Sequence, residues 1–248
     1  MPAIVVIAFI GGLVAGSFVS AVAYRLPLGL SIAGPRSKCP SCGAQIAAYD
    51  NVPVVSWLAL RGRARCCGTP ISPRYPLTEL ALGALFAATV VVYWDEPAEA
   101  VIGLVFVTML AAITLTDLEH RIIPNKILIV GAILCLAIAA PTDPAGLPER
   151  AIAAVAAGAV FFLAALAYPQ GMGLGDVKLA ATMGLFLGRA VGPAILAALL
   201  VGSAVGITLI IRHGSGARKM AIPFGPFLAL GGVVGLLAGD ALVDLYLG

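Results

Sequence analysis

Residues 191–211 read VGPAILAALLVGSAVGITLII and contain no ionisable side chain. A helix needs about 20 apolar residues to cross the hydrocarbon core of a membrane, so this segment predicts a transmembrane helix. Residues 3–23 have the same character. The whole chain agrees, because 61% of its 248 residues are hydrophobic, 11% are charged and its mean hydropathy is +1.06. Soluble domains are about half apolar and a quarter charged, so this composition excludes a water-soluble globular protein.

We expect an all-α polytopic membrane protein with about eight transmembrane helices, because long apolar runs recur along the chain. An even number of spans puts both termini on one side. The expected organisation is a first transmembrane helix at residues 1–24, a small cysteine-containing domain at 25–76 and a helical bundle at 77–248. The expected spans lie near residues 3–23, 77–94, 98–117, 126–140, 151–168, 177–188, 190–211 and 222–246.

The basic residues predict the orientation, because cytoplasmic connections retain Lys and Arg. All 15 except Arg150 and Arg189 fall on one side of this arrangement. We therefore expect an integral plasma (inner) membrane protein with both termini outside and the 25–76 domain in the cytoplasm. A basic inner face suits the anionic headgroups of the lipid bilayer. No recognition motif indicates nucleic acid, and we expect no such partner.

Two aspartates stand where apolar runs meet the cytoplasmic side. Asp117 follows the run 101–116, and Asp176 ends the stretch GMGLGD at residues 171–176, whose glycines permit positive φ and close backbone approach. Taken singly, Asp117 is explained equally well as an interfacial carboxylate. For Asp176 the alternative is a flexible turn between spans, which the three alternate glycines make the weaker interpretation. Taken together, two neighbouring carboxyl groups share a proton, so one activates water while the other polarises a carbonyl. The pair predicts aspartyl proteolysis, which needs no cofactor.

Two other classes of function fit some of these features. An ion or proton-coupled membrane carrier would use the same two aspartates, although both lie on one face rather than near the midplane and the two halves do not repeat. In the other alternative, the cysteine domain is a zinc or redox module that inert helices anchor.

Several short blocks along the chain resemble, in order, those of the type IV prepilin leader peptidase and N-methyltransferase family, whose members are membrane aspartyl proteases with a Gly-x-Gly-Asp signature. The blocks are Gly16-Ser17-Phe18, Arg25-Leu26-Pro27, Cys39-Pro40-Ser41-Cys42, Asn51-Val52-Pro53, Ser56-Trp57, Tyr75-Pro76-Leu77-Thr78-Glu79, Asp117, Ile123-Pro124, Gly173-Leu174-Gly175-Asp176-Val177-Lys178 and Pro223-Phe224-Gly225-Pro226-Phe227.

The resemblance implies that the protein removes a short basic leader from type IV prepilins or pseudopilins at the cytoplasmic membrane face, with Asp117 and Asp176 as the catalytic pair. Many members also N-methylate the new amino terminus with S-adenosylmethionine, and Glu79 matches a residue linked to that step. Ser20 stands where the family usually has Asn, so methylation is left undecided. The residues implied to support or border the peptidase site are Gly173, Gly175, Lys178, Pro223, Phe224 and Gly225.

Four cysteines lie in the 25–76 domain, at Cys39, Cys42, Cys66 and Cys67. Bifunctional members of the family carry two Cys-x-x-Cys pairs, a signature of a tetrahedral thiolate zinc site. Here the second pair reads Ala64-Arg65-Cys66-Cys67, so Cys67 matches, Ala64 lacks a thiol and Cys66 is out of register. The resemblance implies a structural zinc on Cys39, Cys42 and Cys67, with Cys66 as a fourth ligand in strained geometry. The altered pair leaves zinc binding undecided, and a reducing cytoplasm disfavours disulfides.

Overall fold

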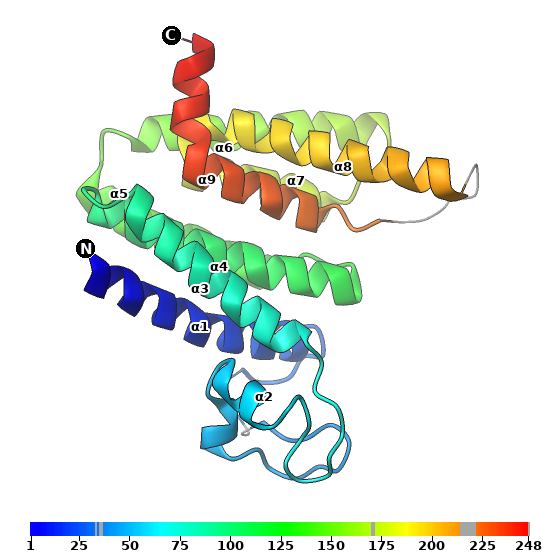
Figure 1. Cartoon of the computed structure of the whole chain (residues 1–248). Helices are drawn as coiled ribbons and strands as arrows, with labels where there is room; N and C mark the ends of the chain where they lie inside the picture. The colour runs from blue at the N-terminus through cyan, green and yellow to red at the C-terminus, as the bar shows by residue number, and fades with distance from the viewer. Residues whose placement is uncertain (33, 35–36, 170–171, 214–221, 248) are drawn as a thin grey trace. The chain divides into compact units, whose positions relative to one another are not determined.

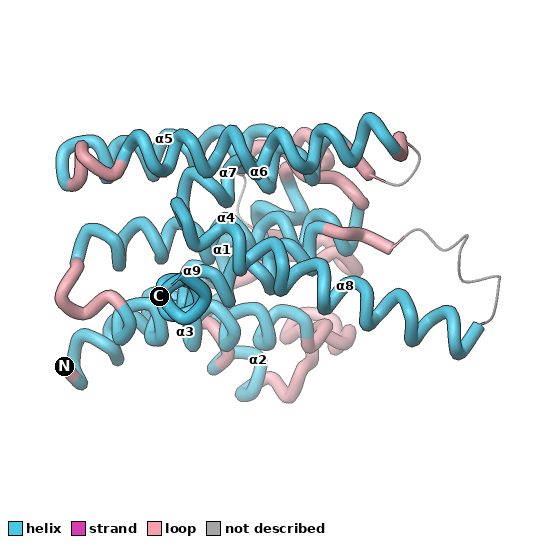
Figure 2. The backbone as a smooth tube through the Cα atoms, turned by 90° about the horizontal axis from the view of Figure 1, so that it is seen from above, coloured by secondary structure: helices cyan, strands magenta, loops and turns pink. Residues whose placement is uncertain are grey.

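The computed structural model describes residues 1–32, 34, 37–169, 172–213 and 222–247. Long helices make up most of this part of the chain (Figure 1). They are α1 (Pro2–Arg25), α3 (Arg74–Val92), α4 (Pro97–His120), α5 (Asn125–Thr142), α6 (Leu147–Ala167), α7 (Leu174–Leu187), α8 (Val191–His213) and α9 (Gly225–Leu247). The short elements are η1 (Ala48–Asn51), α2 (Val55–Ala59) and η2 (Gly188–Ala190). The described residues form no strand, only the isolated bridges Lys38–Gln45 and Arg63–Pro70 (Figure 2).

The prediction of an all-α polytopic membrane protein is confirmed. Among the described residues, seven helical segments are long and apolar enough to cross a membrane, and one of them, Leu174–Arg212, joins α7, η2 and α8 over 39 residues. The eight predicted spans correspond in chain order to the eight long helices. Large apolar side chains such as Val155 and Leu200 are 72% and 63% exposed. Such extensive apolar exposure marks surfaces that face lipid.

The chain divides into two compact units, Met1–Trp94 and Asp95–Gly248. The first contains α1, the cysteine segment and α3, and the second contains α4 to α9. Helix α3 therefore belongs with the cysteine segment, whereas the sequence analysis grouped residues 77–248 as one bundle. The functional division into 1–24, 25–76 and 77–248 stays a prediction.

In the first unit, α1 and α3 pack almost backbone to backbone. A Cβ atom on Gly12 would lie 2.5 Å from the carbonyl oxygen of Leu82, and one on Gly16 would lie 2.6 Å from the Cα of Glu79. Glycine on α1 permits this approach, which is the small-residue mode of helix association in membranes. The contact fixes the second turn of α3, including Glu79, against α1.

The cysteine segment between these two helices contains little regular structure and is held by side-chain contacts. Trp57 Nε1 donates a hydrogen bond to the carbonyl oxygen of Ile71 at 3.1 Å. Arg65 and Asp50 form an ion pair at 2.9 Å. Gly62 has a φ of +68°, and a Cβ there would lie 3.0 Å from the Trp57 ring. These contacts order a segment that is too short to bury a large core of its own.

In the second unit, α4 supplies many of the fully buried side chains, with Phe106 and Ile113 each 0% exposed. Phe106 stacks on Phe186 of α7, with ring centroids 4.8 Å apart. Helix α7 packs closely on α6, because a Cβ on Gly184 would lie 2.5 Å from the carbonyl oxygen of Ala153. Helix α9 contacts both α4 and α7. The end of α4 and the starts of α7 and α9 therefore meet at one end of this unit.

Candidate active site

The two predicted catalytic aspartates lie where α4 ends and α7 begins. Asp117 is in the last turn of α4 and is 6% exposed. Helix α7 begins at Leu174, three residues before the expected span, so Asp176 lies in its first turn rather than in the preceding loop. The two carboxyl groups are close enough to interact electrostatically. The structure thus brings together the two acids that the sequence analysis paired, while their catalytic role stays a prediction.

Gly225, the first residue of α9, holds the carboxyl group of Asp117. Its backbone N–H donates to Asp117 Oδ2 at 2.9 Å, and this hydrogen bond is buried. A Cβ atom on Gly225 would lie only 2.7 Å from the same oxygen and 3.2 Å from Cγ. The glycine therefore serves close approach, because any side chain at this position would push the carboxyl group of Asp117 aside.

The neighbouring residues of the 223–227 block fix the start of α9. Phe224 lies 6.3 Å from the Phe161 ring of α6 and 6.1 Å from the Phe227 ring, measured between centroids. A Cβ on Gly202 of α8 would lie 3.3 Å from Phe224. Pro223 immediately precedes this anchored phenylalanine. Phe224, the residue before Gly225, thus packs against α6 and α8. This packing keeps the Gly225 N–H directed at Asp117.

The two glycines before Asp176 have different roles, one in the cap of α7 and one in a close contact. The N–H of Gly173 donates to Asp176 Oδ2 at 3.3 Å, so the Asp176 carboxylate caps the start of its own helix. A Cβ on Gly175 would lie 3.1 Å from the Cβ of Ile123, in the loop that follows Asp117. Neither Gly173 nor Gly175 has a positive φ. Gly175 therefore provides close approach between the α4–α5 loop and α7, rather than an unusual backbone angle.

Lys178 makes a contact that the sequence analysis did not anticipate. Its Nζ donates to Asn125 Oδ1 at 3.1 Å, on the exposed side of the site. Asn125 opens α5 directly after Ile123 and Pro124. The only sequence signal for Asn125 is its position after Pro124 at a helix start, which gives no indication of its partner. This pair and the Ile123–Gly175 contact link the starts of α5 and α7.

The arrangement has the elements of a two-carboxyl acid–base site. Asp117 and Asp176 each use Oδ2 to accept one backbone N–H, which orients both groups. No hydrogen bond among the described residues engages the Oδ1 atom of either carboxyl. Two carboxyl groups that share a site can hold one proton between them, bind a water and polarise a carbonyl. The chemistry that the geometry supports is hydrolysis of an acyl bond.

Glu79, the predicted methyl-transfer residue in the first unit, is buried at 7% exposure. Its Oε2 accepts the backbone N–H of Val54 at 2.7 Å. Val54 has a φ of +61°, which is strained for a β-branched residue. Glu79 therefore holds the strained turn that opens α2. Whether it acts in methyl transfer stays a prediction.

The four cysteines of the first unit form one cluster. Their Sγ atoms all lie within 4.8 Å of one another, with Cys39 and Cys67 at 3.6 Å and Cys42 and Cys66 at 3.3 Å. Neither Cys66 nor Cys67 has a positive φ. Cys66 thus reaches the cluster in spite of its shifted position.

The same turn is built twice around this cluster. In residues 39–44, the N–H of Cys39 donates to Ala44 and that of Gly43 to Cys39; in residues 64–69, Ala64 donates to Thr69 and Gly68 to Ala64, all at 2.8–2.9 Å. The glycines have φ of +73° and +71°. By position, Ala64 corresponds to Cys39, so the second turn has no thiol where the first turn has one.

Hydrogen bonding makes the four thiols unequal. Hydrogen bonds from the Thr69 side chain and backbone lower the pKa of Cys67 to about 6. The backbone N–H groups of Cys42 and Ser41 lower the pKa of Cys39. The Cys42 thiol, by contrast, raises the pKa of Cys66 to about 12. Because the thiolate is the metal-binding form, Cys67 offers a thiolate near neutral pH, and hydrogen bonding shifts the pKa of Cys39 in the same direction.

Comparisons with known proteins match nearly the whole chain. Residues 10–93 match the model of the bacterial peptidase A24 N-terminal domain, and residues 104–211 match that of the type IV leader peptidase family. A prepilin leader peptidase/N-methyltransferase of Bacillus subtilis is 34% identical over 97% of both chains. One of Stutzerimonas stutzeri is 34% identical over 99% of this chain and 94% of its own length. One of Myxococcus xanthus is 38% identical over 86% of this chain, which spans 65% of that relative. No solved structure matches the chain.

Proposed function

Because the chain belongs to the type IV leader peptidase family, we propose that it removes the leader of type IV prepilins or pseudopilins, with Asp117 and Asp176 as the catalytic pair. The observation that carries the proposal is the convergence at one end of the second unit. The Gly225 N–H orients Asp117, and the Ile123–Gly175 contact brings the start of α7 to the loop that follows Asp117.

In the proposed reaction, one carboxyl group is ionised and the other is protonated. The ionised group accepts a proton from water while the water oxygen bonds to the scissile carbonyl carbon, and the protonated group donates its proton to the carbonyl oxygen. When the C–N bond of this tetrahedral intermediate breaks, the first carboxyl gives its proton to the leaving amine. The second carboxyl recovers a proton from the hydroxyl group as the carbonyl re-forms. Both aspartates regain their starting states.

The test is cleavage of a prepilin-like peptide by the detergent-solubilised protein, with mass spectrometry of the products. We expect Asp117→Asn and Asp176→Asn each to abolish cleavage and to leave thermal unfolding unchanged, because a carboxamide cannot exchange the shared proton. Activity retained by either folded variant contradicts the assignment. Both matched family models describe peptidases, so the comparisons lend the carrier alternative no support.

The proposed site faces the cytoplasm, in an inner-membrane protein with both termini outside. What supports this orientation is the distribution of basic residues, of which only Arg150 and Arg189 fall on the other side in the span arrangement. A basic face toward the cytoplasm also favours contact with anionic lipid headgroups.

A second activity, N-methylation of the new amino terminus with S-adenosylmethionine, is proposed from the relatives' names. Glu79 does not fit direct contact with that cofactor, because its buried carboxylate already holds the Val54 N–H. Glu79→Gln, which keeps an acceptor for Val54, is expected to preserve any methylation that Glu79→Ala removes. The readout is a methyl mass on the cleaved product, and loss in Glu79→Gln as well would indicate a direct chemical role.

A structural zinc ion is proposed for the cysteine cluster, and the residues fit it. Four thiolates at about 2.3 Å from zinc in tetrahedral geometry place their sulfur atoms about 3.8 Å apart. The closest pairs here lie at 3.3–3.8 Å. Bound zinc would cross-link the two cysteine turns, with Cys66 as its fourth ligand in place of the thiol that Ala64 lacks. A closed four-sulfur site leaves no position for a substrate, so the ion would be structural.

A further inference from the structure

Arg150, in the first turn of α6, is a charged side chain buried inside the second unit, at 8% exposure. Its Nη2 forms an ion pair with Oε1 of Glu99 in the first turn of α4. Its Nη1 donates to the carbonyl oxygens of Phe186 at 2.8 Å and Leu185 at 3.4 Å, in the last turn of α7. A single guanidinium group therefore joins the start of α4 to the end of α7.

The end of α7 needs such a partner. The helix stops at Gly188, which has a φ of +53°. The last carbonyl groups of a helix have no partner within it, and an Arg side chain can satisfy them. The adjacent Glu149 completes the arrangement, because its Oε1 accepts the backbone N–H of Arg189 at 2.9 Å. Two consecutive residues of α6 thus supply both a donor and an acceptor to the end of α7.

The same two helices carry the aspartates at their other ends. Asp117 lies 18 residues after Glu99 on α4, about 27 Å along the helix, and Asp176 lies ten residues before Phe186 on α7, about 15 Å. Besides the stack of Phe106 on Phe186, helices α4 and α7 are thus linked by the Arg150 contacts at one end and by the contacts around the aspartates at the other. Loss of the first link would remove the one charged contact that joins the start of α4 to the end of α7 among the described residues.

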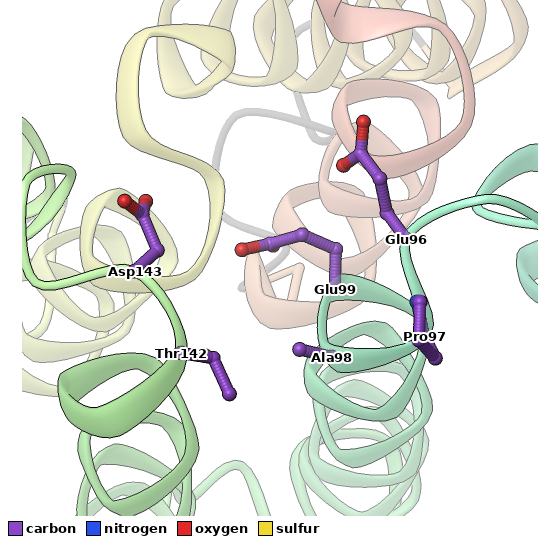
Figure 3. A pocket seen from close by; sticks show the side chains of 6 residues that line it. All are labelled: Glu96, Pro97, Ala98, Glu99, Thr142 and Asp143. Atoms are coloured by element: carbon purple, nitrogen blue, oxygen red, sulfur yellow. The ribbon is translucent and has the colours of Figure 1, made fainter.

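The Arg150 link borders an open pocket of about 290 Å³, where the Glu99 side chain extends from α4 toward Asp143 (Figure 3). The Glu99 side chain is 25% exposed, and that of Arg150 is 10% exposed. Water therefore reaches the carboxylate but hardly the guanidinium. Taking charges out of water offsets much of the attraction in a buried ion pair, and apolar replacements often fold as well as the original. Net stability is thus a weak account of why this pair is present.

We propose that Arg150 is a positioning residue of the peptidase, which fixes α4 and α7 in the relation that brings Asp117 and Asp176 together. The guanidinium fork is suited to this, because it serves a carboxylate with one nitrogen and two carbonyl groups with the other. The kinetic consequence rests on the proposed peptidase function, whereas the geometric consequence does not.

The kinetic test compares Glu99→Gln/Arg150→Met with wild type on the prepilin-like peptide. The double substitution removes both charges, so no unpaired ion is left buried. We expect kcat to fall about 10- to 100-fold with KM within about threefold, because a misplacement near 1 Å costs about this much. Arg150→Lys, which keeps the charge without the fork, should recover part of the rate. Arg189→Met is the matched control, since Arg189 pairs with Asp240 and Asp244 at a surface where all three side chains are at least 52% exposed.

The geometric test needs no substrate. A Cβ on Gly175 would lie 3.1 Å from that of Ile123, slightly closer than in a normal disulfide. In Ile123→Cys/Gly175→Cys protein, mild oxidation should form this disulfide readily, as detected by mass spectrometry of the linked peptides. We expect the Glu99→Gln/Arg150→Met background to lose most of this cross-linking and the Arg189→Met background to retain it.

The two readouts separate the failure of this inference from that of the proposed function. Unchanged cross-linking in the double variant overturns the positioning role, whatever the activity. The positioning role is also overturned if kcat falls only because less of the double variant is folded, as measured by thermal unfolding. If wild type does not cleave the peptide, the proposed function fails, and the cross-linking result alone decides the role of Arg150.

Discussion

The contact between Gly225 and Asp117 predicts that a single methyl group can inactivate the site. In Gly225→Ala, the added Cβ would lie 2.7 Å from Asp117 Oδ2. Carbon and oxygen atoms in contact need about 3.5 Å, so the carboxyl group must move by close to 1 Å. Gly225 does not have a positive φ, and alanine therefore meets no backbone strain there. The substitution acts through the displaced carboxyl group alone.

The magnitude follows from the sensitivity of catalysis to position. A misplacement of about 1 Å costs about 100-fold in rate, which corresponds to about 2.7 kcal/mol of transition-state stabilisation. We expect Gly225→Ala to lower kcat by about this factor, with KM little changed because the substituted residue contacts Asp117 rather than the substrate.

The assay is steady-state cleavage of the prepilin-like peptide, with thermal unfolding measured on the same samples. Gly206→Ala on α8 is the matched control, because a Cβ at Gly206 would meet no atom within 4 Å. It should retain wild-type kcat and unfold at the same temperature or higher. A Gly225→Ala protein with kcat within about threefold of wild type would contradict this prediction, because Asp117 would then tolerate displacement from this N–H.

Two further predictions concern the cysteine cluster and the orientation. Purified protein should contain one zinc per chain by elemental analysis. We expect Cys66→Ser to lose the zinc and Ala64→Cys/Cys66→Ser to regain it. Full zinc in Cys66→Ser would show that Cys66 is not a ligand. A reporter enzyme that is active only outside the cytoplasm should be active when it is fused after residue 248. The same reporter should be inactive when it is inserted near Gly29, an exposed turn with open space around it. The reverse result would invert the proposed topology.

The sequence was sufficient to predict the membrane class, the eight helices and the family, all of which are confirmed. Long apolar runs determine helices in lipid almost alone, since the backbone has no other way to satisfy its hydrogen bonds there. The start of α7 was placed three residues too late, because Gly173 and Gly175 disfavour a helix locally. The Asp176 cap and the contact between Gly175 and Ile123 compensate for the glycines. The contact with Ile123 is a tertiary contact, which a local sequence pattern does not reveal.

The contacts that orient the site were beyond single-sequence reasoning. Gly225 and Asp117 are 108 residues apart in sequence, and no local pattern pairs them. Arg150 entered the sequence analysis only as an exception to the distribution of basic residues. Its burial depends on Glu99 and on the end of α7, which tertiary packing brings together. Cys66 is out of register with the Cys-x-x-Cys spacing, yet in this turn its sulfur lies in the same cluster as that of the neighbouring Cys67.

The repeated cysteine turn separates the scaffold of a binding site from its ligands. Residues 39–44 and 64–69 share their hydrogen bonds and their left-handed glycine, yet only the first places a thiol at its opening position. The backbone pattern is therefore sufficient to shape the loop without that sulfur. Such a loop can present a thiol from a different position, as Cys66 does two residues after Ala64, with the backbone hydrogen bonds of the turn intact. A search for such a centre by the Cys-x-x-Cys spacing alone would therefore miss a loop whose backbone can still bring a thiol to the cluster.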